Sequence, residues 1–569
     1  MDKTQRTGKY GSGGGMMERD HTFLDNLERG MYFNKKSYSD TELKTFEEVQ
    51  KLLPHPILPG REEWTACYWY ALKTLFKNQH VPTKESGYVS NFVDAAFNEN
   101  IFLWDTAFMT MFCNLIHPYV PGIRSLDNFY SRQFDDGEIP REMVRDTGKD
   151  FLVWVNGYDK PLYSYFHNHY GHRRLKGQSP IPYEEMYKPD MGRVIEKNPY
   201  LTLDNLNHPI LAMAEWESYC HTKEIDRLKL VLEPLCRYYA ALKYHLRHAN
   251  GLYVTDWASM DNSPRNRYLG LAIDTSCEMV LFARNILDIM DELEKNGRTV
   301  ADGSLKSELR EDISVLSERI NSLMWNDEDG FYYDLTFDGD QTGMKTIAAY
   351  WALVSGVADP RQARLLAEWL NDRDTFNRLH RVPVLAANEE GYDPEGGYWK
   401  GSVWAPTNTM VVLGLEKNGY HDLAREIGLN HLDAVSKVFT STGTIWENYP
   451  ADSITSGNSD KKDFVGWSGM GPIMFLLRYG IGLRSDIKRD LLVWDISNDI
   501  LKDGPIGCKN YWFFGITADF MAHMDDKKLK LEVNTSKPFE LEILFNGKKR
   551  QYHVDGRFEA IFGDENEQL

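Results

Sequence analysis

The sequence predicts a mainly α-helical fold, in which paired helices close into a toroid, followed by a small C-terminal β domain. From about Arg61 to Gly482, apolar residues recur at the spacing of amphipathic helices. Several connections between these segments are short, which favours antiparallel helix pairs. After Ser485 the apolar residues recur at every second position instead, which is the pattern of half-buried strands.

The length of the chain predicts more than one domain. At 569 residues it exceeds the roughly 250 to 300 residues that one hydrophobic core usually serves. The segment 143–200 has little periodicity, and a loop of this length is usually either a functional lid or disordered. We expect an N-terminal leader and extension over 1–54, a helical domain over 55–485 whose 143–200 insertion caps the pocket, and a β-sandwich-like domain over 486–569.

The predicted helices would pair so that an inner set faces the centre of the toroid and an outer set shields it. Within 274–297, for example, Phe282 and Ile286 fall on one apolar face. Pro234 should kink or split the helix that contains it. The predicted segments are 61–79, 104–118, 124–134, 208–221, 224–247, 274–297, 303–326, 343–358, 360–372, 404–418, 420–438 and 467–481.

The C-terminal region alternates apolar and polar residues. The stretches "KLKLEV" (528–533) and "FELEILFNGKKRQYHV" (539–554) both show this period of two. The pair Asn546-Gly547 favours the positive φ angles of a tight hairpin turn. These stretches predict strands and a hairpin.

Charge and composition exclude several kinds of partner. The net charge is −19, so nucleic acid and anionic membranes would be repelled. No run of 18 apolar residues could form a membrane span. The first twenty residues lack the apolar core of a secretory signal, so a cytoplasmic protein is expected as the sequence stands, or a periplasmic or secreted one if a signal peptide has been removed. The oligomeric state is left open.

The sequence predicts neither a metal site nor a cofactor. The six cysteines are scattered without a C-x-x-C pair, and we interpret them as small buried apolar residues. The histidines of "YFHNHYGHRR" lack the spacing of metal ligands and are interpreted as loop residues. The stretch "NDEDGFYY" (326–333) lacks the full ligand series of a calcium loop.

Clusters of aromatic and polar residues fall between the predicted helices. Aromatic faces stack on the apolar side of a sugar ring, while carboxylates and guanidinium groups bind its hydroxyls, so this mixture favours a sugar pocket. The clusters are "FLWDTAF" (102–108), "DGEIPREM" (136–143), "TDWASMDNSPR" (255–265), "EGGYWKGSVWAPTN" (395–408) and "GTIWENYPAD" (443–452), followed by "GWSG" (466–469).

Each cluster taken singly also has an ordinary interpretation. Trp104 and Asp105 could form a helix N-terminus with an acidic first turn. Asp261 and Asn262 could serve only as a turn before Pro264. The carboxylate of Glu447 could be a solvated loop residue. The joint pattern is more specific than any one cluster.

In their order along the chain, these clusters resemble glycoside hydrolase family 63 and its relatives. These include processing α-glucosidase I, bacterial α-glucosidases, and the mannosylglycerate and glucosylglycerate hydrolases. The resemblance spans Phe102 to Pro472, and "MDNSPR" and "GYWKGSVW" are its most specific parts. It implies an (α/α)6 barrel and exo-acting hydrolysis of α-glycosides with inversion. An α-glucosidase acting on an oligosaccharide or small α-glucoside is expected first, with an α-mannoside or glycosylglycerate hydrolase as the alternative.

By the same resemblance, Asp261 would be the general acid and Glu447 the general base. Lys400 stands where the family motif usually has Arg, so a two-point contact would become a single one. The other residues expected around the substrate are Phe102, Trp104, Asp105, Arg141, Glu142, Trp257, Met260, Asn262, Arg265, Tyr398, Trp399, Lys400, Trp404, Trp446 and Trp467.

Inverting hydrolysis needs one protonated carboxyl and one ionised carboxylate about 6.5 to 9.5 Å apart, so the pKa of Asp261 should be raised. Two carboxylates and a water suffice without a cofactor. An epimerase or lyase on the same fold would instead use His or Tyr as acid and base. A sugar-binding protein without catalysis and a trehalase-like enzyme remain further alternatives.

Overall fold

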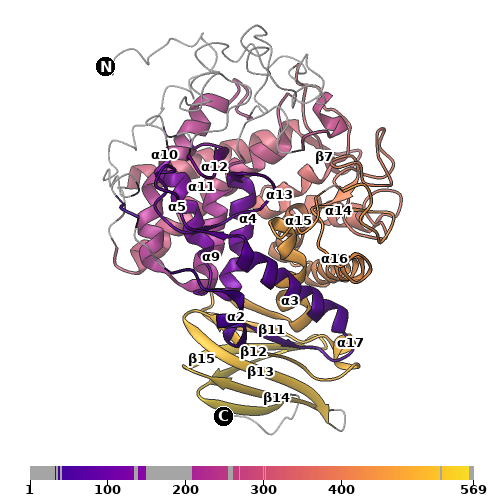
Figure 1. The fold of residues 1–569 in the computed structure, drawn as a ribbon. Helices are drawn as coiled ribbons and strands as arrows, with labels where there is room; N and C mark the ends of the chain where they lie inside the picture. The colour runs from indigo at the N-terminus through magenta and orange to yellow at the C-terminus, as the bar shows by residue number, and fades with distance from the viewer. Residues whose placement is uncertain are drawn as a thin grey trace.

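Most helices precede residue 482, and the two larger sheets are built almost entirely from the strands that follow it (Figure 1). The computed structural model describes residues 33, 36–38, 42–133, 137, 139–148, 208–253, 260–267, 270–298, 300, 303–336, 338–459, 461–525 and 528–562. The leader up to residue 32, residues 149–200 of the predicted insertion with the seven residues after them, and Trp257 lie outside these ranges.

Each predicted helical segment contains a helix in the structure. The helices are α3 (Glu62–Lys77), α4 (Leu103–Cys113), α5 (Leu126–Ser131), α9 (Leu211–Thr222), α10 (Ile225–Leu246), α11 (Ile273–Lys295), α12 (Gly303–Leu323), α13 (Trp351–Ser355), α14 (Pro360–Asn371), α15 (Ala405–Lys417), α16 (His421–Thr442), η9 (Trp467–Met470) and η10 (Gly471–Ile481). Short helices α2 (Phe46–Val49) and α17 (Asn498–Leu501) were not predicted. The apolar spacing therefore located the helical part of the chain.

Helix α10 runs without interruption through Pro234, so the expected split does not occur. Proline removes one backbone donor and crowds the preceding turn, which disfavours a helix interior. The apolar face of α10 packs against α9 and α11. This tertiary packing holds the helix together across the proline.

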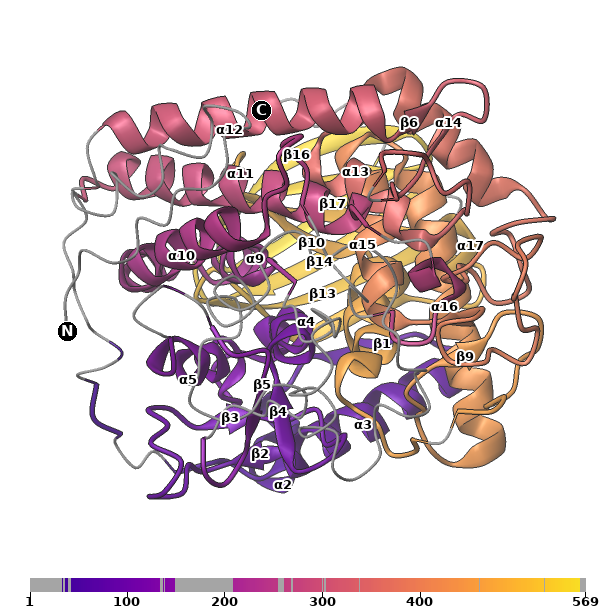
Figure 2. The same cartoon turned by 90° about the horizontal axis from the view of Figure 1, so that it is seen from above.

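Contacts between the helices run in a closed circuit. Helix α4 contacts α9, and the circuit continues through α11, α13, α15 and η9 back to α4. Helices α10 and α12 pack on the outside of α11, and α3 and α16 pack on the outside of η10. Figure 2 shows α4, α9 and α15 of this circuit nearer the centre than α3, α10, α12 and α16.

The N-terminal ends of the inner helices gather around one place. Trp104 lies in the first turn of α4, and Trp467 begins η9. Their rings are 5.6 Å apart, and the ring of Trp404, the residue before α15, lies 5.4 Å from that of Trp467. Helix N-termini carry partial positive charge, which favours carboxylates nearby.

Two sheets pack beneath the opposite ends of these helices (Figure 1). The sheet order is β1-β12-β13-β14-β17 in one and β10-β11-β15-β16 in the other, with β11 and β15 parallel. The strands are β1 (His55–Ile57), β10 (Leu483–Asp486), β11 (Leu491–Asp495), β12 (Ile506–Phe513), β13 (Ile516–Asp525), β14 (Lys528–Thr535), β15 (Phe539–Phe545), β16 (Lys548–Val554) and β17 (Arg557–Phe562).

Aromatic side chains join the two sheets. The rings of Trp494 and Phe520 are 5.4 Å apart, and those of Phe513 and Phe539 are 4.9 Å apart. The hairpin between β15 and β16 is confirmed: Asn546 and its glycine neighbour take φ angles of 50° and 72°. The sheets also recruit β1, which the sequence pattern did not predict.

Short strand pairs connect the loops at the N-terminal ends of the inner helices. Strand β4 (Asn100–Phe102) pairs with β5 (Glu142–Val144), and β8 (Ser402–Val403) pairs with β9 (Tyr449–Pro450). Two further pairs are β2 (Gln79–His80) with β3 (Phe92–Val93) and β6 (Trp325–Asn326) with β7 (Phe331–Tyr332). Aromatic-polar clusters that are far apart in sequence thereby become neighbours.

All six cysteines are free thiols, and Cys220 is the one among them that is only half-buried. Burial raises the pKa of the Cys67 thiol to about 12, which keeps it protonated and unreactive. Among the described residues, no helix is both long enough and apolar enough to cross a membrane.

Candidate active site

The turn that carries Asp261 is anchored from behind by Arg265. Arg265 is 1% exposed and sits in a short helical turn, Pro264–Arg267. Its guanidinium donates to both oxygens of Asp274, at 2.6 and 3.0 Å, and to both oxygens of Asp334, at 2.8 and 2.9 Å. The Nη1 atom also lies 3.3 Å from the sulfur of Met260. These contacts give Arg265 a positioning role, while its predicted substrate contact stays a prediction.

Asn262 joins the Asp261 turn to the loop of the "GYWKGSVW" motif. Its side-chain Nδ2 donates to the carbonyl of Gly397 at 3.1 Å, and its Oδ1 accepts from the backbone N–H of Trp399 at 2.9 Å. Tyr398 lies between these two bonded residues and has a φ of 67°. The sequence suggested that Asn262 shapes the site, but not which backbone it would hold.

Glu447, whose carboxylate bonds to the same loop, is 3% exposed. The Tyr398 hydroxyl donates to its carboxylate Oε1 at 3.2 Å. Its backbone carbonyl accepts from the indole N–H of Trp467 at 2.9 Å and from the Ser468 hydroxyl at 3.1 Å. Pairing of β8 with β9 brings this segment beside the "GYWKGSVW" loop. Glu447 is therefore a buried, positioned carboxylate and not a solvated loop residue.

Four of the predicted tryptophans form one aromatic cluster. The rings of Trp399 and Trp404 stack at 4.1 Å with 10° between their planes. Trp467 contacts both Trp404, at 5.4 Å, and Trp104, at 5.6 Å. Tyr398 adds its ring edge to Trp404 at 4.9 Å. The structure thus gathers residues from two of the sequence clusters and the "GWSG" motif.

Trp104 carries a donor that finds no acceptor within the described part of the chain. The residue is only 9% exposed, and its indole Nε1 makes no hydrogen bond to any described residue. Trp104 and Asp105 do form the first turn of a helix, as the ordinary interpretation required. A buried donor that lacks a protein partner is suited to an acceptor on a ligand.

Carboxyl groups surround Arg141 at the other side of the cluster. Phe102 is opposite Glu142 in the β4–β5 pair, and Arg141 Nη1 lies 3.7 Å from a Glu142 oxygen. Burial raises the pKa of Asp105 well above its usual value, and the charge of Arg141 opposes this. Burial likewise raises the pKa of Glu142 to about 7, against Arg141 and a hydrogen bond from Asn100 at 2.7 Å.

Asp261 is half-buried and shares this electrostatic environment. Burial raises its pKa above the ordinary value, and the positive charge of Arg141 lowers it again in part. The negative charge of Asp261 in turn raises the pKa of Glu142. The positive charge of Arg141 lowers the pKa of Asp105, Glu142 and Asp261 alike, so the three carboxyl groups share one electrostatic environment.

The sequence did not single out His208 and Glu278, which lie next to this cluster. His208 Nδ1 lies 2.7 Å from both oxygens of Glu278, a fully buried residue of α11. The His208 ring is 6.1 Å from that of Trp104. A single His and a Glu on an amphipathic segment carry no sequence signal, because their proximity depends on how α9 and α11 pack.

Two predicted residues have hydrogen-bond partners that are not members of the aromatic cluster. The indole N–H of Trp446 donates to the Thr442 hydroxyl at the end of α16, at 3.1 Å. The backbone carbonyl of the half-buried Lys400 accepts from the backbone N–H of Asp393 at 2.8 Å. Their substrate contacts remain predictions, as does that of Trp257.

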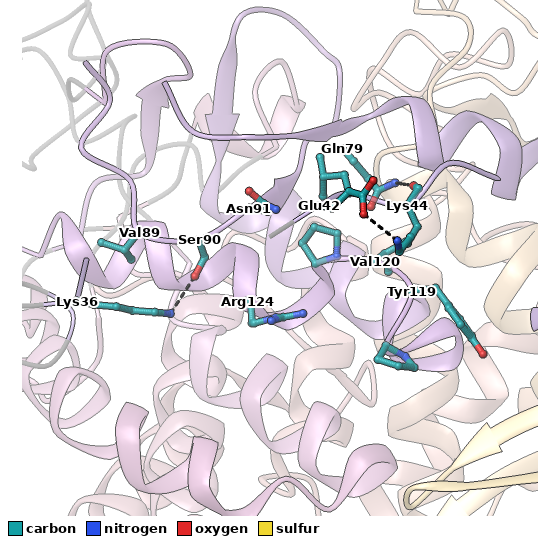
Figure 3. Close-up of a pocket in the computed structure, with 13 residues that line it drawn as sticks. Lys36, Glu42, Lys44, Gln79, Val89, Ser90, Asn91, Tyr119, Val120 and Arg124 are labelled. Carbon is teal, nitrogen blue, oxygen red and sulfur yellow. Dashed lines mark hydrogen bonds and ion pairs between the residues drawn. The ribbon is translucent and has the colours of Figure 1, made fainter. Parts of the chain in front are cut away.

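A separate cavity of about 240 Å³ lies between the 36–44 segment and the chain around Val120 (Figure 3). Lys36 donates to Ser90 there at 2.9 Å, and Lys44 donates to Glu42 at 3.1 Å. None of the predicted site residues is among those that line it. Within the part of the chain that the structure describes, no group of three His, Cys, Asp or Glu side chains is arranged to hold a metal ion.

Comparisons with known proteins relate the chain to glycoside hydrolases. Residues 196–460 match the family model described as the mannosylglycerate hydrolase MGH1-like glycoside hydrolase domain. An uncharacterized protein of Borreliella burgdorferi is 29% identical over 307 residues, which are 52% of this chain and 63% of that protein. The cytosolic neutral trehalase of Kluyveromyces lactis is 28% identical over 166 residues, which are 28% of this chain and 21% of the trehalase. This chain thus spans less than two thirds of the length of both relatives.

Among solved structures, the chain resembles the GH63 mannosylglycerate hydrolase of Thermus thermophilus in complex with Tris and D-glycerate. The TM-score is 0.52 at 16% identity, over 71% of this chain and 98% of that one. At this identity the likeness is one of fold. Together with the family model over residues 196–460, it confirms the predicted resemblance to glycoside hydrolase family 63 and its relatives.

Proposed function

We propose that the protein is an exo-acting α-glycosidase that hydrolyses its substrate with inversion of configuration. The observation that carries this proposal is the arrangement of two carboxylates around one loop. Asp261 lies beside its Asn262 anchor, and Glu447 accepts from Tyr398 on the same loop. The stacked rings of Trp399 and Trp404 belong to this loop and, at 3% and 0% exposed, form part of the buried aromatic cluster beside it.

Asp261 acts as the general acid and Glu447 as the general base. Burial raises the pKa of Asp261, which favours the protonated form that can donate to the glycosidic oxygen. Glu447 removes a proton from water on the opposite face of the sugar ring, and the water oxygen bonds to the anomeric carbon as the leaving group departs. Neither step requires a cofactor.

Other groups of the cluster hold the sugar. Asp105, whose pKa is raised by burial, is a hydrogen-bond donor when protonated. The Nε1–H of Trp104, which has no acceptor among the described residues, is a second donor to a sugar hydroxyl. Donors fixed in a dry aromatic pocket discriminate strongly between substrates with and without the matching hydroxyl.

The fold supports this proposal in its architecture. The closed circuit of α4, α9, α11, α13, α15 and η9, with helices packed outside it, supports an (α/α)6 barrel. We assign this barrel to 55–485 and a β-sandwich-like domain to 486–569. The strand β1, at 55–57, crosses between them by pairing with β12.

Two classes of substrate follow from the comparisons. The family model names mannosylglycerate hydrolase, so an α-mannoside or α-glucoside of glycerate is the first candidate. Arg141, which interacts electrostatically with Asp105, Glu142 and Asp261, is a charge that a glycerate carboxylate could meet. An α-glucoside of another sugar is the second candidate, favoured by the match to a trehalase.

The test is a substrate panel of mannosylglycerate, glucosylglycerate, trehalose and α-linked glucose disaccharides, with product anomers followed by NMR. The wild type should release the β-anomer first, and Asp261→Asn and Glu447→Gln should each lower kcat by at least about 10²-fold. Release of the glycone first as its α-anomer would contradict inversion; from trehalose, in which both glucoses are α-linked, inversion gives one β- and one α-glucose. Variants as active as the wild type would contradict the assigned roles, and a folded wild type that binds but cleaves none of these sugars would favour a binding protein.

A further inference from the structure

A single loop, residues 396–404, contacts both the turn of Asp261 and the carboxylate of Glu447. We propose that Asn262 and Tyr398 work through this loop as positioning residues, which hold the general base ionised and fixed relative to the general acid. This inference rests on the proposed function and goes beyond it, because the resemblance implied only a sugar-contacting role for Tyr398.

Asn262 holds the loop on both sides of Tyr398. Its amide donates to the carbonyl of Gly397 at 3.1 Å and accepts from the N–H of Trp399 at 2.9 Å. A side-chain amide that satisfies one donor and one acceptor of the same backbone stretch fixes the position of that stretch. Because Asn262 directly follows Asp261, the loop is fixed relative to the predicted acid.

The backbone of Tyr398 shows that this loop has a specific conformation. Its φ of 67° lies in the left-handed region, which a residue with a side chain rarely adopts unless its surroundings hold it there. Besides the Asn262 bonds, Gly397 N–H donates to Asn458 at 3.1 Å. Trp404 Nε1 donates to the Tyr398 carbonyl at 3.4 Å. Contacts from three directions therefore maintain the strained residue.

In this conformation the Tyr398 phenol points toward Glu447, the predicted base. The hydroxyl donates to Glu447 Oε1 at 3.2 Å, and the ring edge packs on Trp404 at 4.9 Å. A donor to a carboxylate stabilises the ionised form relative to the protonated one. The general base must be ionised to accept a proton from water, so this hydrogen bond favours the active form of Glu447.

The test removes the hydroxyl but keeps the ring. On a substrate found with the panel above, Tyr398→Phe should lower kcat about tenfold, since one hydrogen bond to a charged group is lost. The acid limb of the kcat/KM profile should move to higher pH, while KM stays within about twofold and the product stays inverted. A raised KM with an acid limb that stays in place would show instead that Tyr398 only contacts the sugar.

A matched control lies nearby. Tyr392 donates to the Asp452 carboxylate at 3.0 Å, and its ring packs against Gly401 of the same loop. Tyr392→Phe removes the same chemical group from the same region without touching Glu447, so the acid limb should not move. An equal shift in this variant would overturn the specific role of Tyr398.

The loop connection is tested by combining variants. Asn262→Ala should also move the acid limb of the kcat/KM profile to higher pH. In the Tyr398→Phe background it should add little to the shift if both residues act through the Tyr398 hydroxyl. Asn458→Ala weakens the same loop from its other side and should give a smaller shift of the same sign. If the acid-limb shifts of Asn262→Ala and Tyr398→Phe added up in the double variant, the two residues would not act through the same hydroxyl.

A second measurement does not depend on turnover. If the hydroxyl bonds to ionised Glu447, Tyr398→Phe should lower the unfolding temperature at pH 7 but much less in a Glu447→Gln background. If the two substitutions are coupled in their effect on the unfolding temperature but the protein hydrolyses no substrate, the contact between Tyr398 and Glu447 is upheld and the proposed function is contradicted. Hydrolysis by the wild type without such coupling would contradict the inference alone.

Discussion

Arg265 and Asp274 form a buried two-point ion pair directly behind the turn that carries Asp261. Both residues are 1% exposed, and the two N···O distances are 2.6 and 3.0 Å. The same guanidinium also binds both oxygens of Asp334, and its positive charge holds the pKa of Asp274 below the ordinary value despite burial. The arginine of "MDNSPR" therefore connects the acid turn to the start of α11.

Replacing Arg265 should destabilise the protein strongly. Arg265→Met leaves two buried carboxylates without their shared cation, and breaking a buried pair in this way costs about 3 to 5 kcal/mol. Denaturant unfolding should report this loss at pH 7. The control is Arg364→Met, which removes an exposed pair with Glu368 on α14 and should cost about 0.5 kcal/mol or less. Similar losses in both variants would contradict a special role for the Arg265 contacts.

Glu142→Gln should shift the pH profile of hydrolysis on its alkaline side. Glu142 and Asp261 interact as like charges, so a neutral Gln should lower the pKa of Asp261. Because the general acid works only when protonated, the alkaline limb of kcat/KM should then move to lower pH. Gln can keep the hydrogen bond with Asn100. An alkaline limb that stays in place would show that Glu142 does not influence the acid.

The control for this variant is Glu292→Gln, near the C-terminal end of α11. There the Glu292 carboxylate accepts a hydrogen bond from the Tyr219 hydroxyl at 2.8 Å. That carboxylate is remote from the cluster around Arg141, so neither limb of the profile should change. A shift in both variants would indicate a general charge effect.

Trp104→Phe should lower kcat/KM by about 10- to 100-fold with little loss of stability. Its indole Nε1 has no acceptor among the described residues, so the substitution breaks no hydrogen bond within that part of the protein. A lost bond to substrate would cost about 1.5 to 3 kcal/mol at most. Steady-state kinetics and thermal unfolding on one preparation check both parts.

Trp494→Phe provides the opposite case. Trp494 lies in the sheets, and its indole donates to the carbonyl of Ile481 at 3.0 Å. This variant should lower the unfolding temperature and leave kcat/KM unchanged. If Trp104→Phe behaved like Trp494→Phe, its role would be structural.

Stability should fall as the pH drops below about 6.5, in part through His431. Burial lowers the pKa of His431 to about 3, and its Nδ1 lies 3.1 Å from the Asn408 amide nitrogen. The unfolded chain binds the proton near pH 6.5 and the folded chain does not until about pH 3, so this group destabilises the fold by up to about 1.4 kcal/mol per pH unit across that window. Unfolding temperatures between pH 7 and pH 4 test this.

His431→Asn should flatten that pH dependence, because the group that takes up a proton on unfolding is gone. His553→Asn, on β16 at the surface of the sheets, should leave the slope as it is in the wild type. An unchanged slope in His431→Asn would assign the acid sensitivity to other groups, such as His221, whose pKa burial lowers to about 4.

Periodicity predicted amphipathic helices such as α3 and α16 because each buries one apolar face, which sets the local spacing of apolar residues. It failed to predict that Pro234 lies inside an unbroken helix, and it did not find β1. Both depend on partners distant in the chain. The packing of α10 against its neighbours outweighs the local cost of proline, and three residues are too few to show a period.

For the site, the sequence by itself predicted a set of candidate residues, because the aromatic-polar clusters occur together in one order along the chain. Only the tertiary structure decided which contacts each residue makes. It turned Arg265 toward Asp274 and Asp334, joined Asn262 to the backbone around Tyr398, and placed the unforeseen pair His208 and Glu278 beside Trp104. Hydrogen bonds and pKa shifts depend on distances of a few ångströms and on burial, and these quantities arise only when segments distant in the sequence meet.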